Sequence, residues 1–241
     1  MPRPVLIFDF DGTVAVGDGP LLAYARAVAA HAASPDALVD AVAFQLATPA
    51  AEVIDGYDVV RRVALAEGID DDALAAAYAA SRAQLGGVEA PVATAAGLAG
   101  FLATVDAVRL LVTNAPATRL DEVLSALGLG GMFDRIVTDA AKPAGLEQLL
   151  DGLDGSPVLA VGDVWRNDLA PAHARGHDTA LVGGYADPAA RPTYRADTLD
   201  ELLPALAAWV AAAGEPPVVA ASEDRTARVD APRVETSPSP A

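Results

Sequence analysis

Two aspartates near the N-terminus are spaced so that their side chains would act together. Asp9 and Asp11 stand two residues apart in an apolar run that begins at Val5, and Gly12 and Thr13 follow them. Residues two apart on a strand share a face, so both carboxylates converge at its carboxyl end. Carboxylates held that close raise each other's pKa unless a cation lies between them. The spacing favours a cation-assisted reaction, while a pair of turn aspartates is an equally simple alternative.

A second group of acidic residues follows another apolar run, Val158–Val161. Asp163 comes directly after Gly162, and Asp168 lies five residues further on. Asp163 alone could be a helix cap, but open α/β sheets bind ligands where the carboxyl ends of their strands meet. Three or four carboxylates at one such edge suit a hard cation, most simply Mg²⁺. A calcium loop is excluded, because its twelfth position needs a Glu and this chain has Pro20 there.

Two further features place hydrogen-bonding groups and a positive charge after other predicted elements. Thr113 and Asn114 end the apolar run that starts at Val108, although Thr-Asn is also an ordinary exit from a strand. Lys142, followed by Pro143, is the single lysine among 16 basic residues. A lone lysine in an arginine-rich chain marks this position as a candidate for a specific role, although chance also explains one residue.

Five short runs predict the strands that carry these residues. The runs are Val5–Phe10, Val108–Thr113, Arg135–Thr138, Val158–Val161 and Thr179–Val182. Short, continuous apolar runs suit parallel strands that are buried on both faces. Helical patterns follow at Ala117–Leu127, Ala144–Leu153, Asn167–Arg175 and Leu199–Ala213. This alternation predicts an α/β fold with a Rossmann-like, doubly wound parallel sheet.

One long interval breaks the alternation of strands and helices. Between the first two strands the chain has helical patterns throughout, at 20–33, 35–47, 58–67, 70–86 and 94–104. We therefore predict an all-helical cap domain at 16–88, inserted into an α/β core formed by 1–15 and 89–213. Residues 214–241 are rich in Pro, Ser and charged groups without periodicity, which predicts a disordered tail.

Composition excludes several classes of protein. The 241 residues carry 33 acidic and 16 basic groups, a net charge of −17, and no cysteine. Such acidity argues against binding nucleic acid or an anionic membrane surface, and the lack of cysteine excludes disulfides and thiol chemistry. No apolar stretch approaches the ~20 residues of a membrane span, and the N-terminus does not resemble a signal peptide. We expect a soluble, cytoplasmic protein, monomeric or homodimeric, that acts on a small molecule.

Taken in order, the motifs resemble those of the haloacid dehalogenase-like (HAD) hydrolase superfamily. They are Asp-x-Asp-Gly-Thr at 9–13, Thr113-Asn114, Lys142-Pro143, and Gly162-Asp163 with Asp168 five residues further on. The helical insert is similar to the cap of phosphoglycolate phosphatase-like members. The resemblance implies a Mg²⁺-dependent phosphatase that hydrolyses a small phosphorylated metabolite, a phosphate monoester, through an aspartyl-phosphate.

The resemblance also implies a role for each motif residue. Asp9 would be the nucleophile, and Asp11 would protonate the leaving oxygen and then take a proton from water. The residues implied for the metal are Asp9, Asp11 through its backbone carbonyl, Asp163 and Asp168, and those implied for the phosphoryl group are Thr113, Asn114 and Lys142. A lysine and a metal ion would offset the repulsion between a carboxylate and a phosphate dianion.

The helical insert bears on which reaction to expect. It contains no lysine, so it cannot form the Schiff base used by phosphonoacetaldehyde hydrolases, and Asp11 argues against members that cleave carbon–halogen bonds. Two alternatives stay open: a phosphotransferase or phosphomutase on the same scaffold, and a catalytically silent binding module. Arg61 or Arg62 could reach a second anionic group of the substrate, although arginines on a helix surface are the simpler interpretation.

Overall fold

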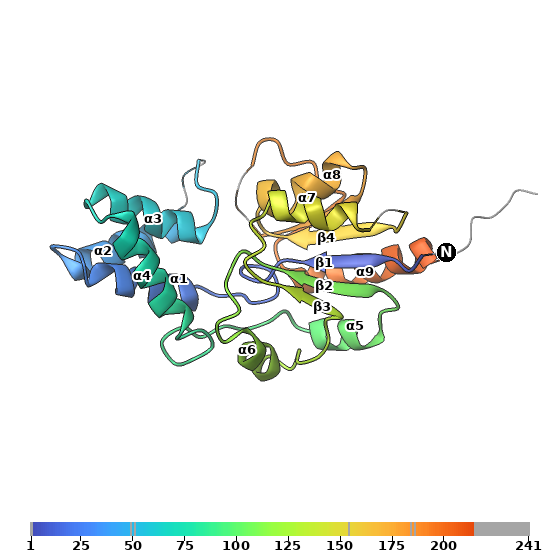
Figure 1. Cartoon of the computed structure of the whole chain (residues 1–241), viewed down its shortest axis with the longest axis horizontal. Coiled ribbons are helices and arrows are strands. Elements are labelled where there is room, and N and C mark those ends of the chain that lie inside the picture. The colour runs from blue at the N-terminus through green and yellow to red at the C-terminus, as the bar shows by residue number, and fades with distance from the viewer. Residues whose placement is uncertain are drawn as a thin grey trace, which may run out of the picture.

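The computed structural model describes residues 2–48, 50, 52–153, 155–183, 185 and 187–214, which form two parts (Figure 1). Four helices that follow the first strand lie together on one side, and a sheet with helices on both faces forms the other. The disordered tail predicted for 214–241 lies outside the described residues, except for Gly214, the last residue of helix α9 (Leu199–Gly214).

A six-stranded parallel sheet forms the centre of the larger part. Its strands are β1 (Val5–Phe8), β2 (Val108–Val112), β3 (Arg135–Val137), β4 (Val158–Gly162), β5 (Asp178–Val182) and β6 (Tyr194–Ala196). The order across the sheet is β3-β2-β1-β4-β5-β6, so the order of strands reverses at β1. All four residues of β1 are buried, with Leu6 and Phe8 packed on one side of the sheet and Val5 and Ile7 on the other.

Helices cover both faces of the sheet, and this confirms the predicted doubly wound fold. One face packs against α5 (Leu98–Thr104), α6 (Leu120–Ala126) and α9, largely through leucines. The other face packs against α7 (Ala144–Asp151), a short π-helix (Trp165–Leu169) and α8 (Ala170–Ala174). Because neither face of the central strands meets water, these strands are continuous apolar runs rather than alternating ones.

The register of the strands brings their ends to one edge of the sheet. Phe8 of β1 lies beside Leu111 of β2 and beside Val161 of β4. The ladder continues one residue further, since the backbone N–H of Asp9 donates to the Val161 carbonyl at 2.9 Å. Asp9 and Asp163 therefore emerge side by side at the point where the strand order reverses, which is where open α/β sheets bind ligands.

The four helices of the smaller part have a hydrophobic core of their own. They are α1 (Gly19–Ala29), α2 (Pro35–Ala47), α3 (Gly56–Ala66) and α4 (Asp71–Arg82), and all lie within the predicted insert at 16–88, which we call the cap. Val28, Val42 and Val60 are fully buried among them. Asp55 and Asp70 cap α3 and α4, because each side chain accepts a hydrogen bond from the backbone in the first turn.

The two chain segments that join the cap to the sheet are bound to each other. Val16 and Ala93 exchange backbone hydrogen bonds of 2.9 and 3.0 Å. Gly17, which follows the first of these residues, has a φ of 110°, a conformation that side-chain-bearing residues rarely adopt. The cap is therefore attached through two chain segments joined by one β-bridge, with a glycine at the turn into α1.

The structure differs from the predicted elements mainly at their ends. β1 ends at Phe8 rather than Phe10, because the Phe10 carbonyl accepts a hydrogen bond from Ala15 at 2.8 Å and the chain turns there. The helix predicted from Thr94 begins at Leu98. Strand β6 has no counterpart in the prediction, because three residues without an apolar run carry no strand signal. None of the described helices has the length and apolarity that a membrane crossing requires.

Candidate active site

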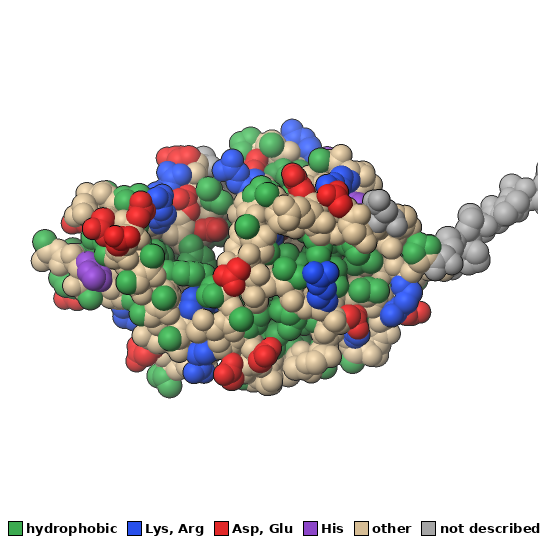
Figure 2. Space-filling view, viewed as in Figure 1, with side chains coloured by type: hydrophobic (Ala, Val, Ile, Leu, Met, Phe, Trp, Pro, Cys, Tyr) green, Lys and Arg blue, Asp and Glu red, His purple; other side chains and the backbone are tan. Residues whose placement is uncertain are grey.

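A cavity of about 270 Å³ lies where the carboxyl ends of β1, β2 and β4 face the cap. Its lining combines residues at these strand ends with residues of the cap and of the loop after β5. On the face shown in Figure 2, acidic and basic side chains are interspersed over both parts of the molecule. Among the described residues, this face therefore shows no single charged patch, and the charged groups that lie close enough to act together are those that line the cavity.

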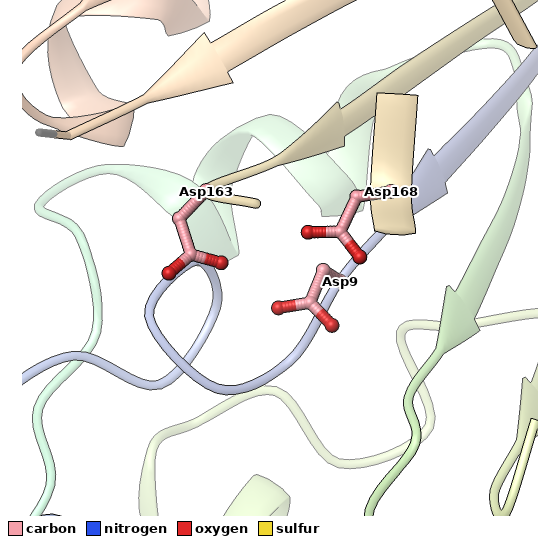
Figure 3. A group of neighbouring side chains, drawn as sticks. All are labelled: Asp9, Asp163 and Asp168. Carbon is pink, nitrogen blue, oxygen red and sulfur yellow. The ribbon is translucent and has the colours of Figure 1, made fainter. Parts of the chain in front are cut away.

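Three buried carboxylates that line this cavity lie close together (Figure 3). They belong to Asp9 directly after β1, Asp163 directly after β4, and Asp168 in the π-helix. One oxygen from each lies within 4.8 Å of the other two. We call these three residues the carboxylate triad. All three are among the four residues that the resemblance implied for a metal.

Two glycines make room for the triad. A side chain at Gly162 would collide with Asp168, and one at Gly12 would collide with the carboxylate of Asp163. Gly12 also has a φ of 86°, which independently favours glycine. Thr13 is fully buried beside them, with its hydroxyl 3.5 Å from a carboxylate oxygen of Asp163. The glycines in both motifs thus bring backbone close to the acidic side chains.

Lys142 lies between two members of the triad. Its Nζ donates to Asp9 Oδ1 at 2.5 Å and to Asp168 Oδ1 at 2.7 Å, and its side chain is only 4% exposed. The backbone N–H of Lys142 donates to Asn114 Oδ1 at 2.6 Å. Asn114, which the resemblance implied as a phosphoryl ligand, thus bonds to the Lys142 loop, while Thr113 is buried at the cavity and its hydroxyl accepts the N–H of Ala115.

Burial and mutual repulsion set the charge state of the triad. Burial, opposed by Lys142 and reinforced by Asp168, raises the pKa of Asp9 to about 7. Burial and the charge of Asp9 also raise the pKa of Asp163 well above its usual range. Burial disfavours the charge on Lys142, but Asp9 and Asp168 outweigh it and raise the lysine pKa. The chain therefore holds three carboxylates against one lysine charge, an imbalance that a divalent cation would correct.

Asp11 does not join the triad with its side chain. Its carboxylate turns to the cap, where Arg82 Nη1 donates to Asp11 Oδ1 at 2.8 Å. The hydroxyl of Tyr57 donates to the same oxygen at 3.3 Å and accepts from Arg82 at 3.2 Å. These contacts hold the side chain of Asp11 apart from the carboxylate triad.

Sequence analysis did not identify Arg82. The two arginines that it did single out are on the cap surface, where Arg61 pairs with Asp71 and Arg62 pairs with Asp58. Arg82 is 1% exposed, at the end of the stripe of α4 that the cap buries. Arg82 follows Tyr78 by four residues and Leu74 by eight, so the three lie on one stripe of the helix. A charged residue on an apolar stripe requires a partner, and this spacing could have identified Arg82 from the sequence.

We expect Arg82→Met to destabilise the protein and slow its reaction. Arg82 is buried but Asp11 is partly exposed, so breaking the pair should lower the free energy of unfolding by about 2 kcal/mol. Loss of the held position of Asp11 should reduce turnover about tenfold. The matched control is Arg61→Met, which removes an exposed pair and should change stability by no more than about 0.5 kcal/mol. Urea unfolding that gives equal losses for both variants would contradict this role for Arg82.

Solved structures that share this fold extend over most of the chain. A HAD-hydrolase of Bacillus subtilis bound to magnesium has a TM-score of 0.57 and 16% identity, covering 86% of this chain and 99% of its own. A predicted phosphoglycolate phosphatase of Haemophilus somnus has a TM-score of 0.57 and 19% identity, covering 85% and 98%. A 2-haloacid dehalogenase of Pseudomonas syringae has a TM-score of 0.51 and 18% identity, covering 86% and 100%.

These similarities establish the fold but not the reaction. No family model and no curated protein sequence matches this chain. The resemblance noted in the sequence is confirmed at the level of architecture, since the chain has the α/β fold of HAD-like hydrolases. The similar structures include both a phosphatase and a dehalogenase, so the fold alone does not distinguish the two reactions.

Proposed function

We propose that this chain, which has the fold of the HAD-like hydrolases, belongs to that superfamily and is a Mg²⁺-dependent phosphatase of small phosphate monoesters. One observation carries the proposal: a buried carboxylate triad with Lys142 bonded to two of its members, beside a separate carboxylate, Asp11, that the cap holds. This arrangement supplies a nucleophile, a cation site, a positive charge and an acid–base group at one end of one cavity.

The triad fits a hard divalent cation. Its donors are carboxylate oxygens, which Mg²⁺ prefers, and among the described residues no histidine belongs to the group. Asp9, Asp163 and Asp168 would hold the ion. When bound, Mg²⁺ would offset negative charge on the phosphoryl group and on the triad.

Asp9 and Asp11 account for the bond changes and proton transfers of hydrolysis, and a bound Mg²⁺ would supply the charge stabilisation. An oxygen of Asp9 attacks phosphorus, and the bond to the leaving alcohol oxygen breaks as Asp11 donates a proton to it. Asp11 then accepts a proton from water as the water oxygen displaces Asp9 from phosphorus. Lys142 stabilises the attacking Asp9 carboxylate in its charged form.

Asp11 favours phosphate ester cleavage over dehalogenation. An alkoxide leaving group needs a proton, whereas a halide leaves as an anion and needs none. Asp11 lines the cavity next to Asp9, and two cap residues, Arg82 and Tyr57, hold its carboxylate in place. A side chain positioned so specifically has a use in phosphate ester hydrolysis and none in carbon–halogen cleavage.

The direct test is phosphate release from an aryl phosphate by the full chain, with Mg²⁺ and with a chelator in its place. Release that requires the metal supports the proposal. Transfer of the phosphoryl group to an added sugar rather than to water would instead identify a phosphotransferase. Binding of Mg²⁺ without release across sugar phosphates, nucleotides and small phospho-acids would identify a silent binding module.

Stabilisation by Mg²⁺ should grow as pH rises. In the folded, metal-free protein the pKa of Asp9 is raised to about 7, whereas in the unfolded chain it is about 4. The stability that Asp9 contributes is therefore fully present below about pH 4 and is lost as pH rises through 7. Mg²⁺ binds the deprotonated triad, so it competes with protons less at pH 8 than at pH 5.5. At a concentration of 100 Kd it should stabilise the fold by about 2.7 kcal/mol at pH 8.

Thermal unfolding at the two pH values, with and without Mg²⁺, checks this expectation. Asp36→Asn, which removes an exposed carboxylate from α2, should leave the pH-dependent gain unchanged. Asp163→Asn should remove most of it. An equal gain at pH 5.5 and pH 8, or no gain at either, would show that the triad does not bind the ion in this way.

A further inference from the structure

The cap contributes acidic and aromatic side chains, and no basic ones, to the lining of the active-site cavity. Asp18 and Asp55 line it together with Tyr57 and Tyr78, and Tyr185 of the core adds a third phenol. Among the described residues that line the cavity, Lys142 is the single basic one, and it is already bonded to two carboxylates. The part of a substrate that lies beyond its phosphate therefore meets negative charge and aromatic rings.

Three of the four arginines of the cap are engaged elsewhere. Arg61 and Arg62 form surface pairs with Asp71 and Asp58. Arg26 donates to the backbone carbonyl of Glu89. None of these side chains is among those that line the cavity. A substrate group with negative charge would have no cation in the cap to receive it.

Arg82 does not alter this conclusion. Its Nη1 is bonded to Asp11, and its other two donors, Nε and Nη2, have no hydrogen-bond partner among the described residues. However, the side chain is 1% exposed and does not line the cavity. Asp11 and Tyr57 bond to Arg82 and line the cavity themselves. A substrate in the cavity would therefore contact the carboxylate of Asp11 and the hydroxyl of Tyr57 rather than the guanidinium of Arg82.

Asp55 is fixed in position at the edge of the cavity. It is the N-cap of α3, and its Oδ1 accepts the backbone N–H of Asp58 at 2.8 Å. The residue is half-buried, and burial raises the pKa of its carboxyl, with the charge of Asp58 and, to a smaller extent, that of Asp168 contributing. A carboxylate held by a helix terminus near other carboxylates gains from a positive ligand.

The tyrosines complete a surface that suits an organic cation. The rings of Tyr57 and Tyr78 meet edge to face at 5.7 Å, and Tyr24 packs against both. The hydroxyl of Tyr78 makes no hydrogen bond to any residue that the structure describes. Aromatic faces attract ammonium groups, and a free phenol oxygen accepts hydrogen bonds from them.

From this lining we infer that the substrate is a small phosphate monoester whose alcohol part carries a protonated amine, which Asp55, Asp18 and the tyrosines of the cap receive. The inference rests on the proposed phosphatase function and narrows its substrate class. Hydrolysis breaks the bond between phosphorus and the alcohol oxygen, and water supplies the new phosphate oxygen, so the products are an amino alcohol and inorganic phosphate. Substrates with a second anionic group, such as phosphoglycolate, are disfavoured.

Three substrates of equal length and different charge test the inference. They are 2-aminoethyl phosphate, 2-hydroxyethyl phosphate and phosphoglycolate, assayed for phosphate release by the full chain with Mg²⁺. We expect kcat/KM for the amine to exceed that for the hydroxyl compound by about tenfold or more, and that for phosphoglycolate by about a hundredfold. The difference should shrink at high ionic strength, because one of the two aspartates is exposed.

Asp55→Asn provides the matched variant. Asparagine caps a helix about as well as aspartate, so the variant should fold, which circular dichroism can verify. We expect the amine-to-hydroxyl ratio of kcat/KM to fall about fivefold or more in Asp55→Asn and to stay at the wild-type value in Asp36→Asn, an exposed cap aspartate outside the cavity.

The possible outcomes separate this inference from the proposed function. Equal rates on the three compounds, a preference for phosphoglycolate, or an unchanged ratio in Asp55→Asn would overturn the inference and leave the phosphatase standing. Cleavage of an aryl phosphate without cleavage of any of the three compounds would do the same. Failure to release phosphate from the aryl phosphate as well would overturn both.

Discussion

Replacing Asp9 by Asn is expected to reduce phosphate release by about 10⁴-fold or more, because the variant has no nucleophile to form the covalent intermediate. An amide is a poor nucleophile, and it leaves Asp168 as the single charged carboxylate bonded to Lys142. The measurement is steady-state phosphate release from an aryl phosphate with saturating Mg²⁺. Activity within tenfold of the wild type would contradict the assignment of Asp9.

A structural control distinguishes lost chemistry from lost folding in this variant. Asn has the size of Asp, and it removes one of three mutually repelling carboxylates from the triad. Since burial and Asp168 disfavour the charged form of Asp9, the metal-free variant should unfold at a temperature no lower than the wild type at pH 8. An inactive and destabilised variant would leave the chemical role unsupported and point to a structural one.

Replacing Lys142 by Met is expected to impair both stability and activity. Asp9 and Asp168 would lose their shared cation while remaining buried, which should lower the free energy of unfolding of the metal-free protein by about 3 kcal/mol. Loss of the positive charge beside the attacking oxygen should reduce phosphate release about 10³-fold. Urea unfolding and steady-state assays measure the two effects.

Lys142→Arg separates the charge of this residue from its shape. The guanidinium keeps the positive charge, so stability should recover in part, but a planar fork does not reproduce the single ammonium that bonds Asp9 at 2.5 Å and Asp168 at 2.7 Å. Activity should therefore remain at least about a hundredfold below the wild type. Full activity of Lys142→Arg would show that this position does not require a compact ammonium.

The sheet was predictable because burial on both faces leaves a strong local pattern. β1 and β4 are wholly buried and are continuous apolar runs in the sequence. The acidic residues that follow these strands had to meet at one edge once the strands were parallel neighbours. β6 was not predictable in this way, because it is three residues long at the edge of the sheet and only partly buried.

The contacts between the cap and Asp11 could not be predicted from local pattern. Arg82 and Asp11 are 71 positions apart in the sequence, and their pairing depends on how the cap sits over the sheet. The sequence singled out Asp11 but not the arginine that binds it. Arg61 and Arg62, which were considered as contacts for a second anionic group of the substrate, pair instead with Asp71 and Asp58 on the cap surface. Helical patterns locate a helix and its buried stripe, but not the residue that a buried charge meets.

The position of Asn114 shows the same limit within the core. The sequence places it at a strand end with Thr113, and its site at the cavity is as expected. Its side chain, however, bonds the backbone of Lys142 on both sides, accepting from the N–H and donating to the carbonyl at 3.4 Å. Asn114 thus orients the lysine, and a direct contact with a phosphoryl oxygen stays a prediction.

Side-by-side release of phosphate and halide tests the central claim most directly. The full chain is incubated with Mg²⁺ and an aryl phosphate, and separately with a 2-haloacid, while free phosphate and free halide are measured. We predict repeated turnover to phosphate, no release of halide, and no release of either product by Asp9→Asn. Release of halide without release of phosphate would contradict the assignment and make the chain a dehalogenase on the same fold.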